Sequence, residues 1–170
     1  MRAFNRAVDL LSAAVRIMIL LQAAAIFAIV IVTVVTRYGF NYVLSWSEEV
    51  PRYLLIWVSF LGAAACVDLR DHIAFDYLFK RFPARVRRAV QFLINAAIFG
   101  FGWIMLVYGI RFVRDFGGDF MESIPFTNVW YYTALPVSGA LMVLYSVRDQ
   151  LNVWIGAERR LEHDPGHSAA

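Results

Sequence analysis

Two carboxylates and an imidazole recur at a spacing of four residues, at Asp68, His72 and Asp76. On an α-helix this spacing would place the three side chains on one face, and together they form a ligand set that suits a divalent cation. Arg70 and Asp71 interrupt the pattern, and the surrounding sequence is hydrophilic. We therefore interpret these residues as part of a solvated turn, and we expect neither a metal ion nor a cofactor.

A second group of ionisable residues, Glu48, Glu49 and Arg52, partly resembles the Glu-Glu-x-x-x-Arg motif of intramembrane prenyl-protein-type proteases. The arginine comes one residue early for that motif, and those enzymes need histidines within later apolar segments. The histidines of this chain lie in hydrophilic segments, at His72, His163 and His167. Their positions argue against a protease centre and against a haem ligated inside a helix bundle, so we expect no catalytic residue.

The composition is that of a membrane protein. Hydrophobic residues make up 61% of the 170 residues and charged residues 17%, whereas an ordinary soluble domain has roughly 25% charged residues. The 16 basic and 13 acidic residues all fall outside four apolar stretches. A soluble protein would instead spread its charges along the solvent face of every helix. This distribution argues against a cytoplasmic enzyme and against a nucleic-acid-binding module.

Four membrane spans follow from these stretches. They are predicted at about residues 17–36, 47–67, 89–110 and 124–147. At about 1.5 Å per residue, each covers the roughly 30 Å hydrocarbon core of a bilayer. The second stretch is free of charge only over 53–67, which is too short to span a bilayer alone. Its extension to residue 47 places Glu48, Glu49 and Arg52 at headgroup depth. Ser45 and Glu48 fit a Ser-x-x-Glu capping box, which predicts the start of this helix.

These spans predict an all-α integral membrane protein with one four-helix domain over residues 1–155. Residues 156–170 are polar, and we expect them to form a disordered cytoplasmic tail. Two short amphipathic segments flank the first and last spans, with apolar residues at Phe4, Val8, Leu11, Val15, Leu151, Trp154 and Ile155. They would lie on the inner leaflet or extend the neighbouring spans.

Lysine and arginine counts predict the orientation, because cytoplasmic flanks carry the excess of basic residues. One side holds twelve: Arg2, Arg6, Arg16, Arg70, Lys80, Arg81, Arg85, Arg87, Arg88, Arg148, Arg159 and Arg160. The other side holds four: Arg37, Arg52, Arg111 and Arg114. Both termini are therefore expected in the cytoplasm.

The predicted spans contain no ionisable side chain in the middle of the bilayer. Proteins that move ions or protons place such groups there, and secondary transporter cores show paired broken helices. Only Pro136 breaks a span near its centre. We therefore expect that the chain binds no substrate and does not carry one alone.

Small residues gather within the later spans, at Gly62, Ala63, Ala64, Ala65, Cys66, Gly100, Gly102, Gly139 and Ala140. Such residues let helices approach closely in lipid, where packing replaces the hydrophobic driving force. They would pack the four helices against one another, or some would face a larger partner.

Taken in order, several short elements of the chain resemble the small membrane subunit of tripartite ATP-independent periplasmic (TRAP) transporters. They are RYGFN at 37–41, LSWSEE at 44–49 with Arg52-Tyr53, FLGAA at 60–64, DHIAFD at 71–76, SIP at 123–125, and ALP at 134–136 leading to Leu141-Met142. The resemblance covers about residues 5 to 150, which is nearly the whole chain.

The resemblance implies a non-catalytic subunit of a multi-pass complex in the bacterial inner membrane. In that family a large membrane subunit holds the substrate and sodium sites, and a periplasmic binding protein delivers an organic acid. The small subunit is expected to brace the large one within the bilayer, and no nucleic acid is involved. A membrane-embedded enzyme or an electron-transfer anchor subunit is the alternative that the residues leave open.

Two groups of residues are expected to make contacts. The candidate partner interface is Trp46, Glu48, Glu49, Arg52 and Gly62, whose alternative role is a capped helix start with a Glu–Arg pair within the helix. The candidate contact loop for the binding protein is Arg111, Arg114, Asp115, Asp119 and Glu122, which would otherwise be a solvated loop. His72 and Asp76 are marked by the resemblance alone.

The predicted orientation can be checked with reporter fusions. Alkaline phosphatase, which is active only in the periplasm, is expected to stay inactive when fused after Arg16, Arg88 or Arg148 and to become active after Asn41. Periplasmic activity at any of the first three positions would show that the orientation is wrong.

Overall fold

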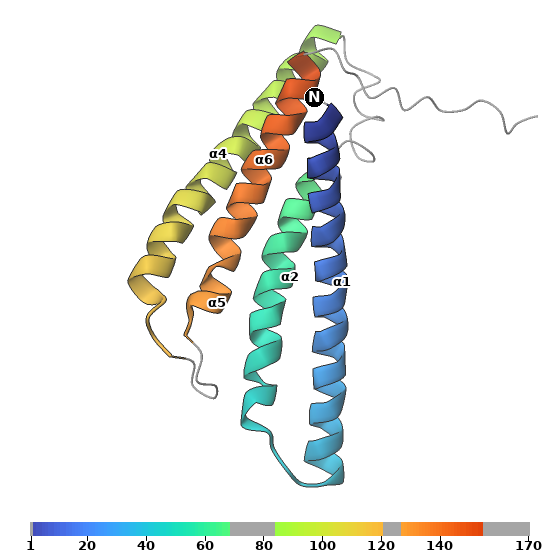
Figure 1. Cartoon of the computed structure of the whole chain (residues 1–170), viewed down its shortest axis with the longest axis vertical. Helices are drawn as coiled ribbons and strands as arrows, with labels where there is room; N and C mark the ends of the chain where they lie inside the picture. The colour runs from blue at the N-terminus through green and yellow to red at the C-terminus, as the bar shows by residue number, and fades with distance from the viewer. Residues whose placement is uncertain (1, 69–83, 121–126, 155–170) are drawn as a thin grey trace, which may run out of the picture.

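The computed structural model describes residues 2–68, 84–120 and 127–154, and the elements in these ranges are helices. They are α1 (Arg2–Gly39), a 3₁₀ turn η1 (Ser45–Ser47), α2 (Glu49–Asp68), α4 (Ala84–Phe116), the short α5 (Val129–Tyr132) and α6 (Ala134–Trp154). Figure 1 shows the long helices side by side. The predicted all-α fold is confirmed.

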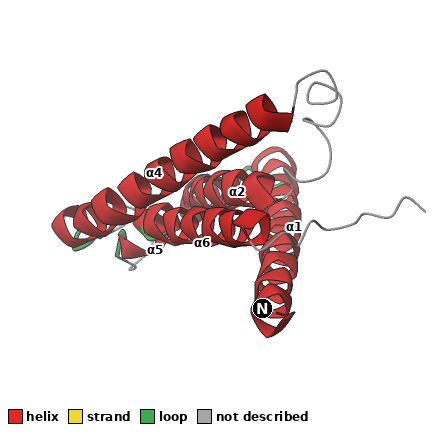
Figure 2. Cartoon of the chain, turned by 90° about the horizontal axis from the view of Figure 1, so that it is seen from above, coloured by secondary structure: helices red, strands yellow, loops and turns green. Residues whose placement is uncertain are grey.

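The long helices form two hairpins. α1 packs on α2, α4 packs on α6, and α2 joins the hairpins through its contacts with α6. Seen from above, α4 and α1 lie on opposite sides, with α2 and α6 between them (Figure 2).

Within the described residues, three segments are long and apolar enough to cross a membrane: Phe4–Gly39, Ser45–Asp68 and Phe92–Phe116. α1 and α4 extend well beyond the predicted spans 17–36 and 89–110, so the amphipathic segment before the first span is part of α1. The fourth predicted span, 124–147, falls mostly on α5 and α6. Four spans and cytoplasmic termini stay predictions. The tail at 156–170, His72, Asp76 and Glu122 lie outside the described residues.

The entry into α2 differs from the capping box predicted from Ser45 and Glu48. Ser45 begins the 3₁₀ turn η1, and α2 starts only at Glu49. The Ser47 hydroxyl donates a hydrogen bond to the carbonyl oxygen of Leu44 at 2.8 Å, which stabilises this tight turn. The preceding loop contains Asn41 at a φ of 49°, a left-handed conformation that asparagine tolerates better than most residues.

Glycines bring α4 and α6 into close contact. A Cβ atom on Gly139 would lie 2.7 Å from the backbone nitrogen of Leu106 and 2.8 Å from the carbonyl oxygen of Gly102. One on Gly109 would lie 2.9 Å from Cδ of Pro136. The backbones can approach this closely only because side chains are missing. Gly102 and Gly139 therefore pack the chain against itself, as one of the two interpretations expected.

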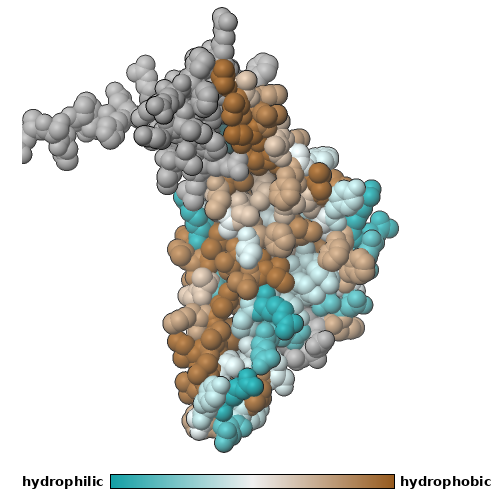
Figure 3. All heavy atoms as spheres, turned by 180° about the vertical axis from the view of Figure 1, so that it is seen from behind, coloured by the Kyte–Doolittle hydropathy of each residue, from teal (hydrophilic) through white to brown (hydrophobic). Residues whose placement is uncertain are grey.

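A single hydrophobic cluster joins all four long helices. Its buried members are Val8, Val15, Leu61, Ala64, Ala65, Val67, Met105, Leu141, Met142 and Tyr145. Many large apolar side chains of α1 and α4 are instead exposed. Figure 3 shows hydrophobic atoms over much of the visible surface, with hydrophilic ones gathered at the lower end of the α1–α2 hairpin and along one edge. An apolar exterior of this kind is what lipid requires.

The close α4–α6 contact predicts a difference between two glycine substitutions. Gly139→Leu should destabilise the chain by about 1–3 kcal/mol, because overpacking forces the two helices apart. Gly100→Leu is the matched control, since nothing lies within 4 Å of a Cβ atom at that position. Thermal unfolding of the detergent-solubilised chain measures both, and equal midpoints would contradict the predicted packing.

Candidate functional site

An aromatic cluster joins the two hairpins near the predicted periplasmic side. The ring of Tyr53 on α2 stacks on Tyr131 of α5, with centroids 4.5 Å apart and planes inclined by 10°. The indole nitrogen of Trp57 donates a hydrogen bond to the carbonyl oxygen of Trp130 at 3.0 Å. Stacked aromatic pairs contribute beyond their buried area, by about 0.5–1.5 kcal/mol. The α5 turn is thereby held against α2.

The candidate partner interface lies beside this cluster, and most of it faces outward. Trp46 is 39% exposed, and Arg52 is exposed. Glu48 forms an ion pair with Arg37 at 3.5 Å, and both side chains are more than half exposed. This pair links the end of α1 to the start of α2. It replaces the predicted pair between Glu48 and Arg52 within one helix.

The remaining two residues of the candidate interface differ in their surroundings. Glu49 is 7% exposed and accepts a hydrogen bond from the hydroxyl of Tyr53. It therefore supports the aromatic cluster from inside the chain. Gly62 has nothing within 4 Å of the position that a Cβ atom would take. The predicted group is thus divided between one buried residue and four with outward or open positions.

The candidate contact loop for the binding protein begins at the end of α4. Arg111, Arg114, Asp115 and Asp119 are exposed there. The guanidinium carbon of Arg111 lies 5.7 Å from the ring centroid of Tyr108. The backbone nitrogen of Asn128 donates a hydrogen bond to the carbonyl oxygen of Asp119 at 2.8 Å, which brings the two described ends of the loop together.

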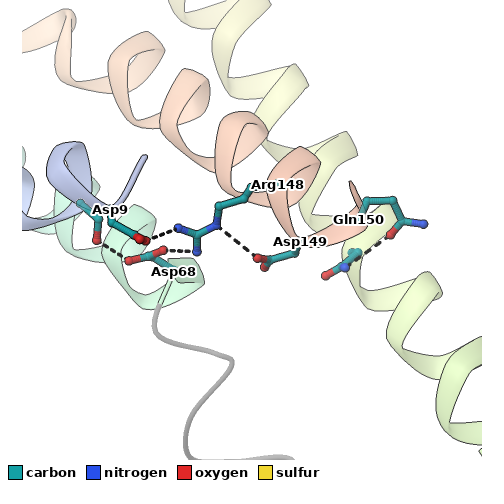
Figure 4. A network of polar contacts seen from close by, with 7 residues as sticks. Asp9, Asp68, Arg148, Asp149 and Gln150 are labelled. Carbon is teal, nitrogen blue, oxygen red and sulfur yellow. Dashed lines mark hydrogen bonds and ion pairs between the residues drawn. The ribbon is translucent and has the colours of Figure 1, made fainter. Parts of the chain in front are cut away.

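A third group, at the opposite end of the bundle, was missed in the sequence. The side chain of Arg148 on α6 is 2% exposed, and its guanidinium lies 2.5 Å from Asp68 of α2 and 3.3 Å from Asp9 of α1. Figure 4 shows it pointing toward these two acids, with Asp149 on its other side at 3.6 Å. The Ser12 hydroxyl donates a hydrogen bond to the other oxygen of Asp68.

The acids around Arg148 favour its charged form although the side chain is buried. Arg148 directly follows the predicted fourth span. Burial acts to lower its pKa, but Asp68, Asp149 and Asp9 outweigh this effect and raise the pKa of Arg148 above its ordinary value. A buried ion pair is costly to break, at about 3–5 kcal/mol, because the remaining partner is left uncompensated. The group therefore fixes three helices to one another.

This arrangement corrects one sequence interpretation. The spacing of Asp68, His72 and Asp76 predicts a solvated turn, but in the structure the side chain of Asp68 is only 10% exposed and binds Arg148 and Ser12. No group of three or more residues that could hold a metal ion is found within 2–68, 84–120 and 127–154. One signal in the sequence could have revealed the Arg148 cluster. Asp68 and Arg148 have opposite charges, and each directly follows a predicted span on the same side of the membrane.

Polar side chains inside the helices serve packing. The hydroxyl of Ser138 donates to the carbonyl oxygen of Ala134 within α6 at 2.8 Å. Between helices, the Ser146 hydroxyl donates to the carbonyl oxygen of Asn95 at 3.0 Å. These bonds satisfy polar groups inside the apolar interior. The two hydrogen bonds hold α6 together and join it to α4.

Comparison with known proteins finds relatives among the permease proteins of TRAP transporters. The chain is 30% identical over 128 residues to the sialic acid TRAP transporter permease protein SiaT of Haemophilus influenzae, a match covering 74% of the chain and 20% of that protein. It is 24% identical over 107 residues to the isethionate TRAP transporter permease protein DctMQ of Oleidesulfovibrio alaskensis, covering 61% of the chain and 17% of the relative. The chain therefore spans about a fifth of the length of these two relatives.

A third relative is closer in length. The sialic acid TRAP transporter small permease protein SiaQ of Vibrio cholerae is 22% identical over 130 residues, which are 76% of this chain and 75% of the relative. Residues 26–156 match the family described as tripartite ATP-independent periplasmic transporters, DctQ component. This match covers well over half of the sequence, and the chain belongs to the DctQ component family of TRAP transporters.

Proposed function

We propose that this chain is the non-catalytic small transmembrane subunit of a TRAP transporter in the bacterial inner membrane. It braces a large membrane subunit during sodium-coupled uptake of an organic acid, which a periplasmic binding protein delivers. The observation that carries the proposal is the family match over residues 26–156. In SiaT and DctMQ the matching segment is about a fifth of a longer permease protein, which supports a large membrane partner for the separate chain.

The internal packing supports a bracing role. Close glycine contacts join α4 to α6, while an aromatic stack and a buried ion pair join the two hairpins. A helix bundle whose helices are joined near both ends and in the middle resists deformation when a neighbouring protein moves against it. Arg148 of α6 and Asp68, the last residue of α2, are buried and paired with each other. They are thereby engaged in holding helices together.

We assign the contacts with the large subunit to Trp46, Glu48, Arg52 and Gly62, whose positions are outward or open. Glu49 acts indirectly, through its contact with Tyr53. The contact with the binding protein is assigned to the exposed end of α4, at Arg111, Arg114, Asp115 and Asp119, together with Glu122.

The proposal predicts that the affinity-tagged chain co-purifies from mild detergent with a much larger hydrophobic protein. Deletion of the chain should abolish uptake of an organic acid, because the large subunit loses its support. Mass spectrometry of the purified complex and a radiolabelled uptake assay in cells test both points.

A purified chain that transports substrate alone in proteoliposomes would contradict this assignment. Stoichiometric haem or metal in the purified chain would favour the enzyme or electron-transfer alternative. Unchanged uptake after deletion would show that the chain is not needed for transport.

Substitutions in the candidate interface should separate assembly from folding. Trp46→Ala should lower the yield of the large subunit by about tenfold, which corresponds to a lost contact of roughly 1.4 kcal/mol, while the chain keeps its own thermal midpoint. Trp103→Ala is the matched control, since Trp103 is an exposed tryptophan on α4. Glu49→Ala should instead lower the midpoint, because Tyr53 loses its partner. Equal yields for both tryptophan variants would remove Trp46 from the interface.

A further inference from the structure

The two hairpins are fixed to each other near both of their ends. Near one end, Tyr53 of α2 stacks on Tyr131, and Trp57 bonds to the backbone of Trp130. Toward the other end, Arg148 of α6 reaches across to Asp9 of α1 and to Asp68, the last residue of α2 (Figure 4). Between these levels, α2 and α6 share an apolar contact.

The acids around Arg148 are not equivalent. The side chain of Asp68 is 10% exposed, whereas that of Asp9 is 54% exposed. Water can therefore solvate much of the Asp9 carboxylate, but Asp68 depends on Arg148 and on the Ser12 hydroxyl for compensation. An exposed ion pair contributes at most modestly, while a buried one is strongly coupled. Asp68 and Arg148 are the pair on which the contact depends.

We propose that Arg148 and Asp68 form an ionic joint that docks one end of the α4–α6 hairpin onto the α1–α2 hairpin. The aromatic stack docks the other end independently. Loss of Arg148 leaves the buried Asp68 carboxylate uncompensated, so the hairpins open at this end and pivot about the aromatic contact. The joint is a property of this chain's own fold and does not rest on the proposed transport function.

The joint predicts that Asp68→Asn weakens docking of the hairpins in the wild-type chain but strengthens it in the Arg148→Met variant. Asp68→Asn in the wild-type chain removes the partner of a buried guanidinium and should weaken docking. The same substitution in Arg148→Met removes an uncompensated carboxylate and should restore docking, because a neutral pair needs no ionic partner. Asp9→Asn should have little effect in either background, since this acid is largely solvated.

Cysteine labelling can report the two ends separately. Ala64 on α2 and Ala134 at the start of α6 are both fully buried, and the native Cys66 is exposed. Each probe, Ala64→Cys or Ala134→Cys, is introduced into the full-length chain in detergent. Labelling with N-ethylmaleimide is followed by mass spectrometry. The exposed Cys66 is the internal reference, and its labelling is expected to be equal in every variant.

With Arg148→Met, labelling at position 64 should become about tenfold faster or more, because the Asp68 carboxylate is then buried without its partner and the opened state is favoured. Position 134 should stay protected. The double variant with Asp68→Asn should return position 64 toward its original protection. Arg114→Met, which removes an exposed arginine on α4, should change neither probe.

Three results would overturn the joint. Unchanged protection of position 64 in Arg148→Met would show that the pair does not dock the hairpins. Equal exposure of positions 64 and 134 would show general unfolding without a pivot. A double variant that labels as fast as Arg148→Met, or faster, would show that the uncompensated Asp68 is not the cause.

Discussion

Helices surrounded by lipid gain little from hiding apolar side chains from one another, because lipid tails are equally apolar. Association then depends on close backbone approach and on polar contacts between helices. Both are present here. Gly139 and Gly102 bring α4 against α6 at distances that a Cβ atom would not permit. The contact between the hairpins, in contrast, combines an apolar middle with polar and aromatic ends.

The placement of the charged residues follows from the same constraint. An uncompensated charge in the middle of a bilayer is expensive, and the buried pair of Arg148 and Asp68 lies toward one end of the described bundle. Arg148 directly follows the predicted fourth span, and Asp68 is the last residue of α2. At the headgroup depth that the predicted spans give them, their desolvation would cost less, while pairing still makes the contact specific in position. The ion pair can thus set how α2 and α6 align along their axes.

Local patterns in the sequence predicted the helices well, and tertiary contacts poorly. Charge-free stretches located α1 and α4 because each helix must match the bilayer by itself. The capping box at Ser45 failed because a 3₁₀ turn formed there instead. Gly62 and Gly139 look alike in the sequence, yet only Gly139 has a helix against it. The sequence does not reveal the Arg148 cluster because the acids that other helices contribute, Asp68 and Asp9, are 80 and 139 positions away.

These internal contacts bear on the bracing role that we propose for the chain. A brace transmits force only as far as its own parts stay fixed to one another. If α4 and α6 slid past each other, or if the hairpins changed their angle, a partner held at Trp46 and Arg52 would gain freedom even with its interface intact. If the proposed role holds, residues that face inward, such as Gly139 and Arg148, matter to it as much as the surface does. Rigidity is then the property that the proposed partner uses.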